Sequence, residues 1–132
     1  IHAMVVYLRT VKPQSSAVTL TAGEAGHDAN LAYGRQVYAR ECANCHRLDG
    51  SGTQSRYEML HGAETVADRN GVNLTQVVLY GSSMDTPSGH VSMPGFGKGL
   101  TDTDVAAVVN FTTDKLGGHA SGLSPQDVAS RR

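Results

Sequence analysis

Cys42-Ala43-Asn44-Cys45-His46 is the stretch that decides the fold of this 132-residue sequence, and it contains both cysteines of the chain. The pattern C-x-x-C-H is typical of covalent attachment of a c-type haem. Two thiols three residues apart at the end of a helix can each add to one of the two haem vinyl groups, and the next residue then lies under the iron. We therefore predict one haem c, bound through Cys42 and Cys45, with His46 as the proximal iron ligand.

Three other interpretations of the two cysteines have less support. A thioredoxin-type redox pair expects a preceding strand and a βαβ context, and the sequence predicts neither. A zinc site needs two more ligands, and with no further cysteine it would have to recruit scattered histidines. A disulfide between such near neighbours closes a very short loop and stabilises little.

The second axial ligand must come from another part of the chain, and Met93 in Met93-Pro94-Gly95-Phe96 is the best candidate. A thioether is a soft ligand that suits iron in a site of low polarity, and a Met/His pair raises the reduction potential. Pro94 stiffens the backbone next to the sulfur, and Phe96 is suited to pack on the ring. We therefore predict His46 and Met93 as the two metal ligands.

Other methionines and histidines remain as alternatives for this position. Met84 also lies in an irregular stretch, and His61 or His90 would give a bis-histidine site. Met59 is too close to the loop after His46 to be preferred, and Met4 belongs to the N-terminal segment. The remaining histidines are expected to be solvated at the surface: His2, His27 and His119.

The composition favours a core that is completed by a bound group. Hydrophobic residues make up 39% of the chain, but it has no tryptophan, two phenylalanines and five tyrosines. Aromatic rings usually supply the largest burial per residue, so a haem would provide apolar surface that the side chains lack. The polypeptide without haem is therefore expected to be largely unfolded.

Charge and hydropathy exclude several classes of protein. Eleven basic and twelve acidic residues give a formal charge of -1 without a long run of either sign, so a nucleic-acid grip is not indicated. The longest apolar stretch, Ala3 to Leu8, is far shorter than the roughly 20 residues of a membrane-spanning helix. The first residues also lack the features of a secretory signal and an initiating methionine. We expect a processed or excised piece with no membrane-spanning segment.

The hydrophobic pattern predicts an all-α domain of three to four helices with long loops around one haem. A first helix over 31–42, capped by Asp28 or Asn30, carries Gly34 on the same face as Tyr38, and a glycine there indicates a tight helix crossing. A short helix is expected over 73–80, capped by Asn73. The last long helix opens at 101–104, and a short turn follows Ser124. Its inner stripe is expected to be Val105, Val108, Val109 and Thr112. No alternating strand pattern is evident.

With these residues in place, the stretch 30–118 resembles a class I c-type cytochrome. Gly34 and Tyr38 stand eight and four residues before Cys42, like the first-helix glycine and aromatic of that family. Val108 and Phe111 match the apolar and aromatic pair on the last helix. The resemblance implies the class I cytochrome c fold, in which these two helices cross.

Three segments carry a narrower resemblance: GRQVYARECANCHRLDGSG, NLTQVVLYG and MPGFGKGLTDTDVAAVVNF. They are similar to haem domains in multi-haem cytochrome subunits of bacterial membrane-bound dehydrogenases, which oxidise alcohols, aldehydes, sugar acids such as gluconate, or nicotinate-type heterocycles. The resemblance implies a dehydrogenase catalytic subunit and other haem domains of the same parent chain as partners, with a quinone, an oxidase or another respiratory acceptor downstream. It also implies a periplasmic location, associated with the cytoplasmic membrane through the parent complex.

The same resemblance, with a short internal repeat, suggests the domain organisation. The segment 3–7 lines up with 107–111, so residues 1–12 are interpreted as the end of a preceding cytochrome domain's last helix. Residues 13–29 are rich in Ser, Thr, Ala and Gly and are assigned to a linker. The haem domain is assigned to 30–118 and a C-terminal tail to 119–132.

One departure from the family pattern concerns the loop after the haem motif. The family usually has a proline there, whose carbonyl accepts a hydrogen bond from the proximal histidine. Here residues 57–62 read Tyr-Glu-Met-Leu-His-Gly, with no proline. We expect the backbone carbonyl of Glu58 to serve instead, which leaves the rigidity of the loop open.

The expected function is electron transfer by a six-coordinate haem with no catalytic residue in this chain, because a saturated iron does not readily bind peroxide or oxygen. One alternative is a five-coordinate haem with peroxidase-like or gas-binding activity, which the missing proline and the glycines at 95 and 97 keep open. Another is a docking domain whose haem is mainly structural. Reduction kinetics and the iron–sulfur absorption band distinguish these alternatives.

Overall fold

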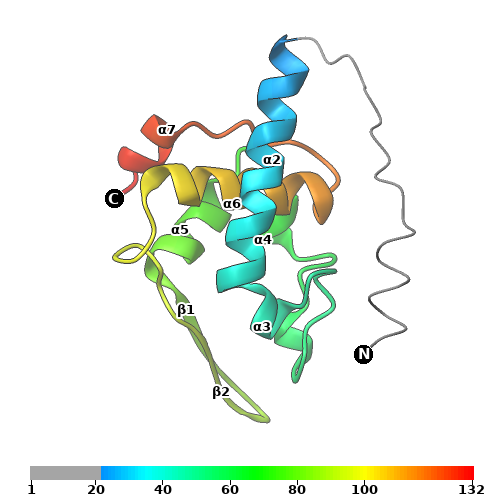
Figure 1. Ribbon diagram of the computed structural model, residues 1–132. Coiled ribbons are helices and arrows are strands. Elements are labelled where there is room, and N and C mark those ends of the chain that lie inside the picture. Colours follow the sequence, from blue (N-terminus) through cyan, green and yellow to red (C-terminus); the bar gives the residue numbers. More distant parts are fainter. Residues whose placement is uncertain (1–21) are drawn as a thin grey trace, which may run out of the picture.

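The computed structural model describes residues 22–132, and the fold given below is that of this part of the chain (Figure 1). The predicted helix end at 1–12, the first residues of the predicted linker, Met4 and His2 lie outside the described residues.

Six α-helices and one hairpin make up the described part of the chain. The helices are α2 (Ala22–Glu41), α3 (Ala43–His46), α4 (Glu64–Ala67), α5 (Val72–Tyr80), α6 (Asp102–Lys115) and α7 (Pro125–Ala129). A single 3-10 turn, η1 (Arg56–Glu58), and two strands, β1 (Ser82–Thr86) and β2 (Gly89–Met93), complete the list. The mostly helical class I cytochrome c fold is therefore confirmed, but with six α-helices, three long and three short, where the sequence predicted three to four.

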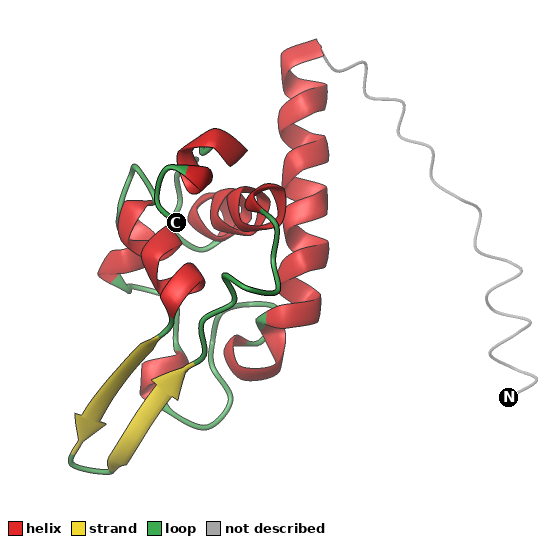
Figure 2. Ribbon diagram, turned by 90° about the vertical axis from the view of Figure 1, so that its left-hand side faces the viewer, coloured by secondary structure: helices red, strands yellow, loops and turns green. Residues whose placement is uncertain are grey.

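The crossing of α2 over α6 is the central contact of the fold, and both views show it (Figures 1 and 2). A side chain at Gly34 would overlap the carbonyl oxygen of Ala107 and come 2.8 Å from Cβ of Phe111. Next to this contact the rings of Tyr38 and Phe111 pack with centroids 5.4 Å apart. The prediction that Gly34 marks a tight helix crossing is confirmed, because only a residue without Cβ lets the two backbones come this close.

The core joins α2, α5, α6 and α7. Val105, Val108, Val109 and Thr112, the predicted inner stripe of α6, are all buried. The buried apolar cluster consists of Leu31, Val37, Tyr38, Leu74, Val78, Leu79, Leu100, Val105, Ala106, Val108, Val109, Phe111, Leu123 and Val128. Among the helices of residues 22–132, none is both long and apolar enough to span a bilayer.

Side-chain caps fix the starts of two helices where the sequence predicts them. Thr101 and Asp104 form a capping box at the start of α6, and Ser124 and Asp127 form another at the start of α7. Each box pairs a hydroxyl and a carboxylate with backbone N–H groups that have no partner inside the helix. At α5 the predicted cap is wrong: the helix begins one residue earlier, after Gly71, whose φ of 60° is favourable for glycine.

The first long helix starts earlier than predicted. It begins at Ala22 rather than at Leu31, so residues 22–29, which were assigned to the linker, are helical. Residues 26–29 are exposed. Hydrophobic periodicity arises where a helix contacts a core, and an exposed stretch such as 26–29 shows none.

The hairpin is the second difference from the predicted all-α architecture. β1 and β2 pair in antiparallel fashion, with Ser82 opposite Met93 and Met84 opposite Val91. Figure 2 shows the hairpin extending away from the helices. Most of its residues are exposed. Since neither face is covered, its sequence has no need of the apolar alternation by which a half-buried strand is detected.

Candidate functional site

Both cysteines and His46 lie on the single turn where α2 passes into α3. The amide N–H of Cys42 donates to the carbonyl of Tyr38 at 2.9 Å and ends α2, and the N–H of His46 donates to the carbonyl of Cys42 at 3.0 Å. This turn carries both thiols and the imidazole: Cys42 is the N-cap of α3, and Cys45 and His46 are residues of that four-residue helix. The helix before Cys42 takes the place of the strand that a thioredoxin-type pair would need.

Both thiols are free, and their surroundings differ. Cys42 is half-buried against the hydrophobic core, and Cys45 is exposed. Burial, with smaller contributions from Glu41 and Cys45, raises the pKa of the Cys42 thiol to about 11. The Cys42 thiol is therefore protonated at neutral pH, and in this form it is a poor nucleophile.

The His46 ring is held by the backbone of the following loop. Its Nδ1 lies 2.6 Å from the carbonyl oxygen of Glu58. A carbonyl only accepts, so Nδ1 carries the hydrogen and donates, which leaves the lone pair on Nε2. Metal-binding histidines are typically oriented by such a bond from the other ring nitrogen. The prediction that the Glu58 carbonyl replaces that of the family's proline is confirmed.

The side chain of Glu58 stiffens the same loop, and the sequence interpretation missed it. Its carboxylate accepts from the N–H of Thr53 at 2.8 Å, the hydroxyl of Thr53 at 2.8 Å and the N–H of Gln54 at 2.7 Å. These bonds lower the pKa of Glu58 to about 2. Ser55 and Glu58 also form a capping box around η1. The S-x-x-E spacing is the signal that could have identified this residue.

Met93 is the last residue of β2 and is half-buried. The segment after it is fixed to the end of α5, because the N–H groups of Phe96 and Gly97 donate to the carbonyls of Val78 and Leu79 at 2.9 and 3.0 Å. Phe96 packs against the core from a partly buried position. Met93 also lines a surface groove of about 400 Å³ at the base of the hairpin.

The alternative ligands lie in other settings. Met84 on β1 is 49% exposed. His90 lies 2.8 Å from the carboxylate of Asp85 across the hairpin, and Nε2 of His61 faces the carbonyl of Asp49. Met59 is 45% exposed. Ligation of the iron by Met93, rather than by one of these side chains, stays a prediction.

One surface histidine was predicted wrongly. His27 is exposed as expected, but His119 is half-buried. Its Nδ1 lies 3.0 Å from the carbonyl of Gly117 and its Nε2 lies 3.2 Å from the carbonyl of Asp68. His119 thus links the segment after α6 to the loop before α5, a long-range contact that no local sequence pattern reveals.

The donor set fits a c-type haem. The two free thiols and the oriented imidazole of His46 are groups that such a haem requires, and the thioether of Met93 is the candidate for the second axial position. Both views place α3 and the hairpin in the lower half of the molecule (Figures 1 and 2). Four large apolar side chains from the loop after His46 and from the hairpin are exposed: Leu48 at 56%, Tyr57 at 40%, Met59 at 45% and Met84 at 49%. Exposed apolar surface of this kind is suited to cover a hydrophobic macrocycle.

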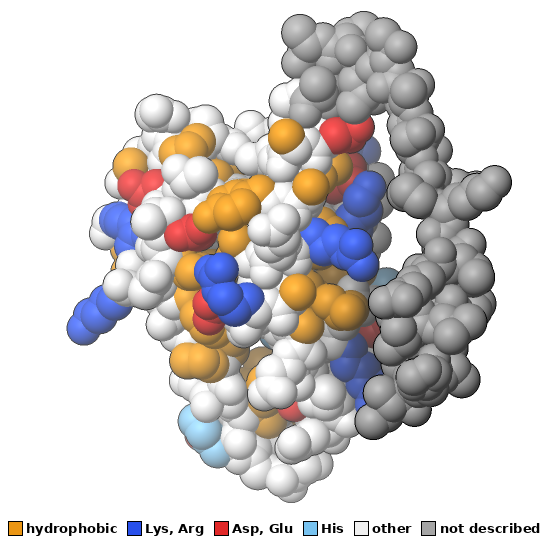
Figure 3. Space-filling view, in the orientation of Figure 1, with side chains coloured by type: hydrophobic (Ala, Val, Ile, Leu, Met, Phe, Trp, Pro, Cys, Tyr) orange, Lys and Arg blue, Asp and Glu red, His pale blue; other side chains and the backbone are white. Residues whose placement is uncertain are grey.

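The other interpretations of the site find less in the structure. Within residues 22–132, no three or more His, Cys, Asp or Glu side chains come together as a metal-binding group, so a zinc site lacks its ligands there. On the face shown in Figure 3, Lys and Arg side chains are interspersed with acidic, hydrophobic and uncharged groups.

Residues 29–111 match the sequence profile of the family described as cytochrome C oxidase, cbb3-type, subunit III, and this match covers more than half of the chain. The chain belongs to this c-type cytochrome family. The cytochrome is also 32% identical, over 147 aligned positions, to the cytochrome c subunit of alcohol dehydrogenase (quinone) from Gluconacetobacter polyoxogenes. That similarity covers 100% of this chain and 31% of the relative.

Two further relatives of the cytochrome are similar over its larger part. The cytochrome c subunit of alcohol dehydrogenase (quinone) from Gluconobacter oxydans (strain 621H) is 36% identical over 104 residues, or 75% of this chain and 22% of that subunit. The gluconate 2-dehydrogenase cytochrome c subunit of Pantoea cypripedii is 35% identical over 107 residues, or 75% of this chain and 24% of that subunit. The chain thus spans less than a third of the length of these relatives. It is a haem-binding electron-transport domain of the kind found in dehydrogenase cytochrome subunits.

Proposed function

We propose that this cytochrome domain holds one covalent haem c in six-coordinate His/Met ligation and relays electrons without making a product of its own. The single observation that carries the proposal is the 2.6 Å contact between Nδ1 of His46 and the carbonyl of Glu58. It leaves Nε2 as a lone-pair donor, on the same turn as two free thiols. The bound haem supplies the one-electron chemistry of its iron.

Cys42 and Cys45 hold the cofactor in this proposal. Each would form a thioether by net addition of its S–H across a vinyl double bond of the haem, so no oxidant would be needed. Two thioethers prevent loss of the haem from so small a domain.

His46 and Met93 are the proposed iron ligands. Glu58 orients the imidazole through its carbonyl, and its carboxylate fixes the surrounding loop through bonds to Thr53 and Gln54. Met93 is supplied by the base of the hairpin, where Phe96 and Gly97 are hydrogen-bonded to α5. With His46 and Met93 both bound, the iron would have no free position for oxygen or peroxide, which would favour electron transfer.

The position of the domain in a respiratory chain is also a proposal. Its relatives are named as cytochrome c subunits of quinone-dependent alcohol dehydrogenases and of gluconate 2-dehydrogenase. By analogy, we propose that the domain receives electrons from a dehydrogenase catalytic subunit and passes them through other haem domains to a quinone, an oxidase or another respiratory acceptor. A periplasmic location, associated with the cytoplasmic membrane through the parent complex, belongs to the same proposal.

Mass spectrometry and a visible spectrum of the purified protein test the attachment. We expect the mass of the chain plus one haem. Cys42→Ala/Cys45→Ala should have the mass of the bare chain, and each single variant should shift the absorption bands of the reduced protein, because one vinyl group remains. A colourless wild-type protein with the mass of the bare chain would overturn the proposal.

Two methionine variants test the distal ligand. Met93→Ala should abolish the weak absorption band of the iron–sulfur bond in the oxidised protein and lower the reduction potential. Met84→Ala, on the paired strand, is the matched control and should leave both unchanged. The reverse pattern would assign the distal position to Met84.

Stopped-flow reduction tests the relay. A quinone alcohol dehydrogenase catalytic subunit should reduce the holoprotein rapidly and in a concentration-dependent manner. Tight binding with slow reduction would instead indicate a docking domain whose haem is structural.

A further inference from the structure

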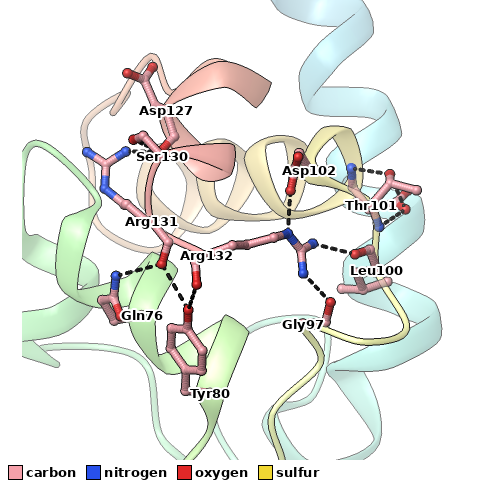
Figure 4. A network of polar contacts seen from close by, with 11 residues as sticks. Gln76, Tyr80, Gly97, Leu100, Thr101, Asp102, Asp127, Ser130, Arg131 and Arg132 are labelled. Carbon is pink, nitrogen blue, oxygen red and sulfur yellow. Dashed lines mark hydrogen bonds and ion pairs between the residues drawn. The ribbon is translucent and has the colours of Figure 1, made fainter.

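The side chain of Arg132 joins three acceptors beside the segment that follows Met93. Its guanidinium donates to the carbonyl of Gly97, to the carbonyl of Leu100 at 2.7 Å and to the carboxylate of Asp102 at 2.5 Å (Figure 4). One planar group therefore connects the loop over 97–100 to the first turn of α6. Such a fork of donors is specific to arginine, because a lysine ammonium cannot match three acceptors in fixed planar geometry.

The backbone that carries Arg132 is itself anchored to α5. The hydroxyl of Tyr80, the last residue of α5, lies 3.0 Å from the carbonyl oxygen of Arg131 and 2.6 Å from that of Arg132. The side-chain amide of Gln76 lies 3.5 Å from the same Arg131 oxygen. Figure 4 shows both side chains reaching from α5 to this backbone. The guanidinium is thus held in place from the end of the helix that leads into the hairpin.

The loop held by Arg132 is packed closely against α5 on its other side. A Cβ at Gly97 would come 2.8 Å from the carbonyl oxygen of Leu79, and one at Gly95 would come equally close to that oxygen. The hydrogen bonds from Phe96 and Gly97 to α5 fix the same face. The segment is therefore clamped between the α5 carbonyls and the Arg132 guanidinium.

Only three residues separate Gly97 from Met93, and one of them is Pro94, whose φ is fixed. A displacement of Gly97 is therefore passed to Met93 along a short backbone, whose Phe96 and Gly97 amides are hydrogen-bonded to α5. At Gly81, a Cβ would come 2.5 Å from the carbonyl oxygen of Met93, so the start of the hairpin also lies tightly against this residue.

We propose that Arg132 is a positioning residue for the distal ligand: by bridging Gly97, Leu100 and Asp102, it holds the segment after Met93 so that the sulfur stays on the iron. The inference rests on the proposed His/Met ligation. This role predicts that the contacts of Arg132 determine the fraction of the protein in which Met93 is bound to the iron.

Variants of the holoprotein test this role. Arg132→Ala should raise the Met93-dissociated fraction about tenfold, the size expected for the loss of one or two charge-assisted hydrogen bonds. The iron–sulfur band should then disappear about one pH unit earlier in an alkaline titration, and amide exchange at Phe96 and Gly97 should be faster. Arg132→Lys should restore only part of the difference.

Arg131→Ala is the matched control, because the Arg131 side chain donates to the carbonyl of Asp127 in α7 and not to the Met93 segment. Arg131→Ala should match the wild type in the iron–sulfur band, in the pH at which that band is lost and in amide exchange at Phe96 and Gly97. Asp102→Asn weakens one of the three contacts without removing the guanidinium, and should shift the titration in the same direction by a smaller amount. This variant keeps the test decisive if Arg132→Ala does not fold.

The outcomes separate the two proposals. If the wild type shows the iron–sulfur band and Arg132→Ala and Asp102→Asn keep the wild-type titration, the positioning role is wrong and the ligation stands. If the wild type binds haem through His46 but lacks the band, or keeps it in Met93→Ala, the ligation by Met93 is wrong, and the role of Arg132 is overturned with it.

Discussion

The hydroxyl of Tyr38 donates a 2.8 Å hydrogen bond to the carbonyl oxygen of Arg47, the residue directly after His46. Tyr38 is 1% exposed and packs on Phe111 at the helix crossing. Burial, with smaller contributions from the nearby Cys42 and Asp49, raises the pKa of the Tyr38 hydroxyl. The hydroxyl therefore remains a hydrogen-bond donor throughout the neutral pH range. The core of the fold is thereby linked directly to the turn that carries the haem motif.

Removing this hydroxyl should loosen that turn. Tyr38→Phe keeps the ring packing but leaves the Arg47 carbonyl without its donor, and we expect the free energy of unfolding to fall by about 1–2 kcal/mol. Chemical denaturation of the two holoproteins measures this difference in the free energy of unfolding. Tyr57→Phe is the control, because Tyr57 is 40% exposed. Equal stabilities of Tyr38→Phe and the wild type would show that the bond contributes nothing.

Arg47 itself has a strained backbone. Its φ of 58° and ψ of 165° lie in a region that is almost confined to glycine, and it is the one non-glycine residue with positive φ among those described. Arg47→Gly should relieve this strain, and after the entropy lost by glycine on folding we expect a gain of about 1 kcal/mol in the free energy of unfolding. Arg47→Ala keeps the Cβ and removes the side chain, so it separates backbone strain from charge. If both variants changed stability equally, strain would not be the cause.

Much of the helical framework could be predicted because its signals are local. The capping boxes at Thr101 and Ser124 are fixed by residues three positions apart, and the buried stripe of α6 follows helical periodicity. Gly34 indicated a long-range contact only because a glycine inside a helix needs a packing reason. The haem motif likewise lies on one turn, and its orientation by Glu58 depends on a backbone carbonyl that any residue provides.

The rest could not be predicted because it depends on exposed or distant groups. The hairpin from Ser82 to Met93 has no buried face, so it lacks the alternation that reveals a strand. His119 meets the carbonyl of Asp68, and Arg132 meets Gly97 and Leu100, through contacts formed only after the helices have packed. Such polar links depend on tertiary geometry rather than on any local pattern.

Acid should remove a polar contact at the start of α6. The carboxylate of Asp104 accepts from the hydroxyl of Thr101 at 2.6 Å and from the hydroxyl of Tyr33. These bonds, with that of Thr101 the strongest, hold the pKa of Asp104 below its ordinary value of 3.8. A carboxyl group with a lower pKa in the folded state stabilises the fold above pH 3.8, and this contribution is lost as the pH falls through the folded-state value.

Asp104→Asn should therefore be less stable than the wild type at neutral pH, and the gap should narrow as the pH falls below 3.8. Urea unfolding of both holoproteins over a pH series measures the gap, in which effects shared by the two proteins cancel. Asp28→Asn, whose native side chain is 59% exposed, should follow the wild-type curve. A gap that stayed constant or widened in acid would contradict the assigned sign.

The helix crossing gives the sharpest contrast between two variants of one helix. A methyl group at Gly34 overlaps the carbonyl of Ala107, which belongs to the α6 backbone and cannot move aside as a side chain would. Gly34→Ala should therefore lower the free energy of unfolding by about 3 kcal/mol, at the upper end of overpacking effects. Gly26→Ala, also in α2, meets nothing within 4 Å and should leave stability unchanged or raise it by up to about 1 kcal/mol. Thermal or urea unfolding of the two holoproteins provides the comparison, and similar losses in both would mean that the close approach of α2 and α6 does not limit this fold.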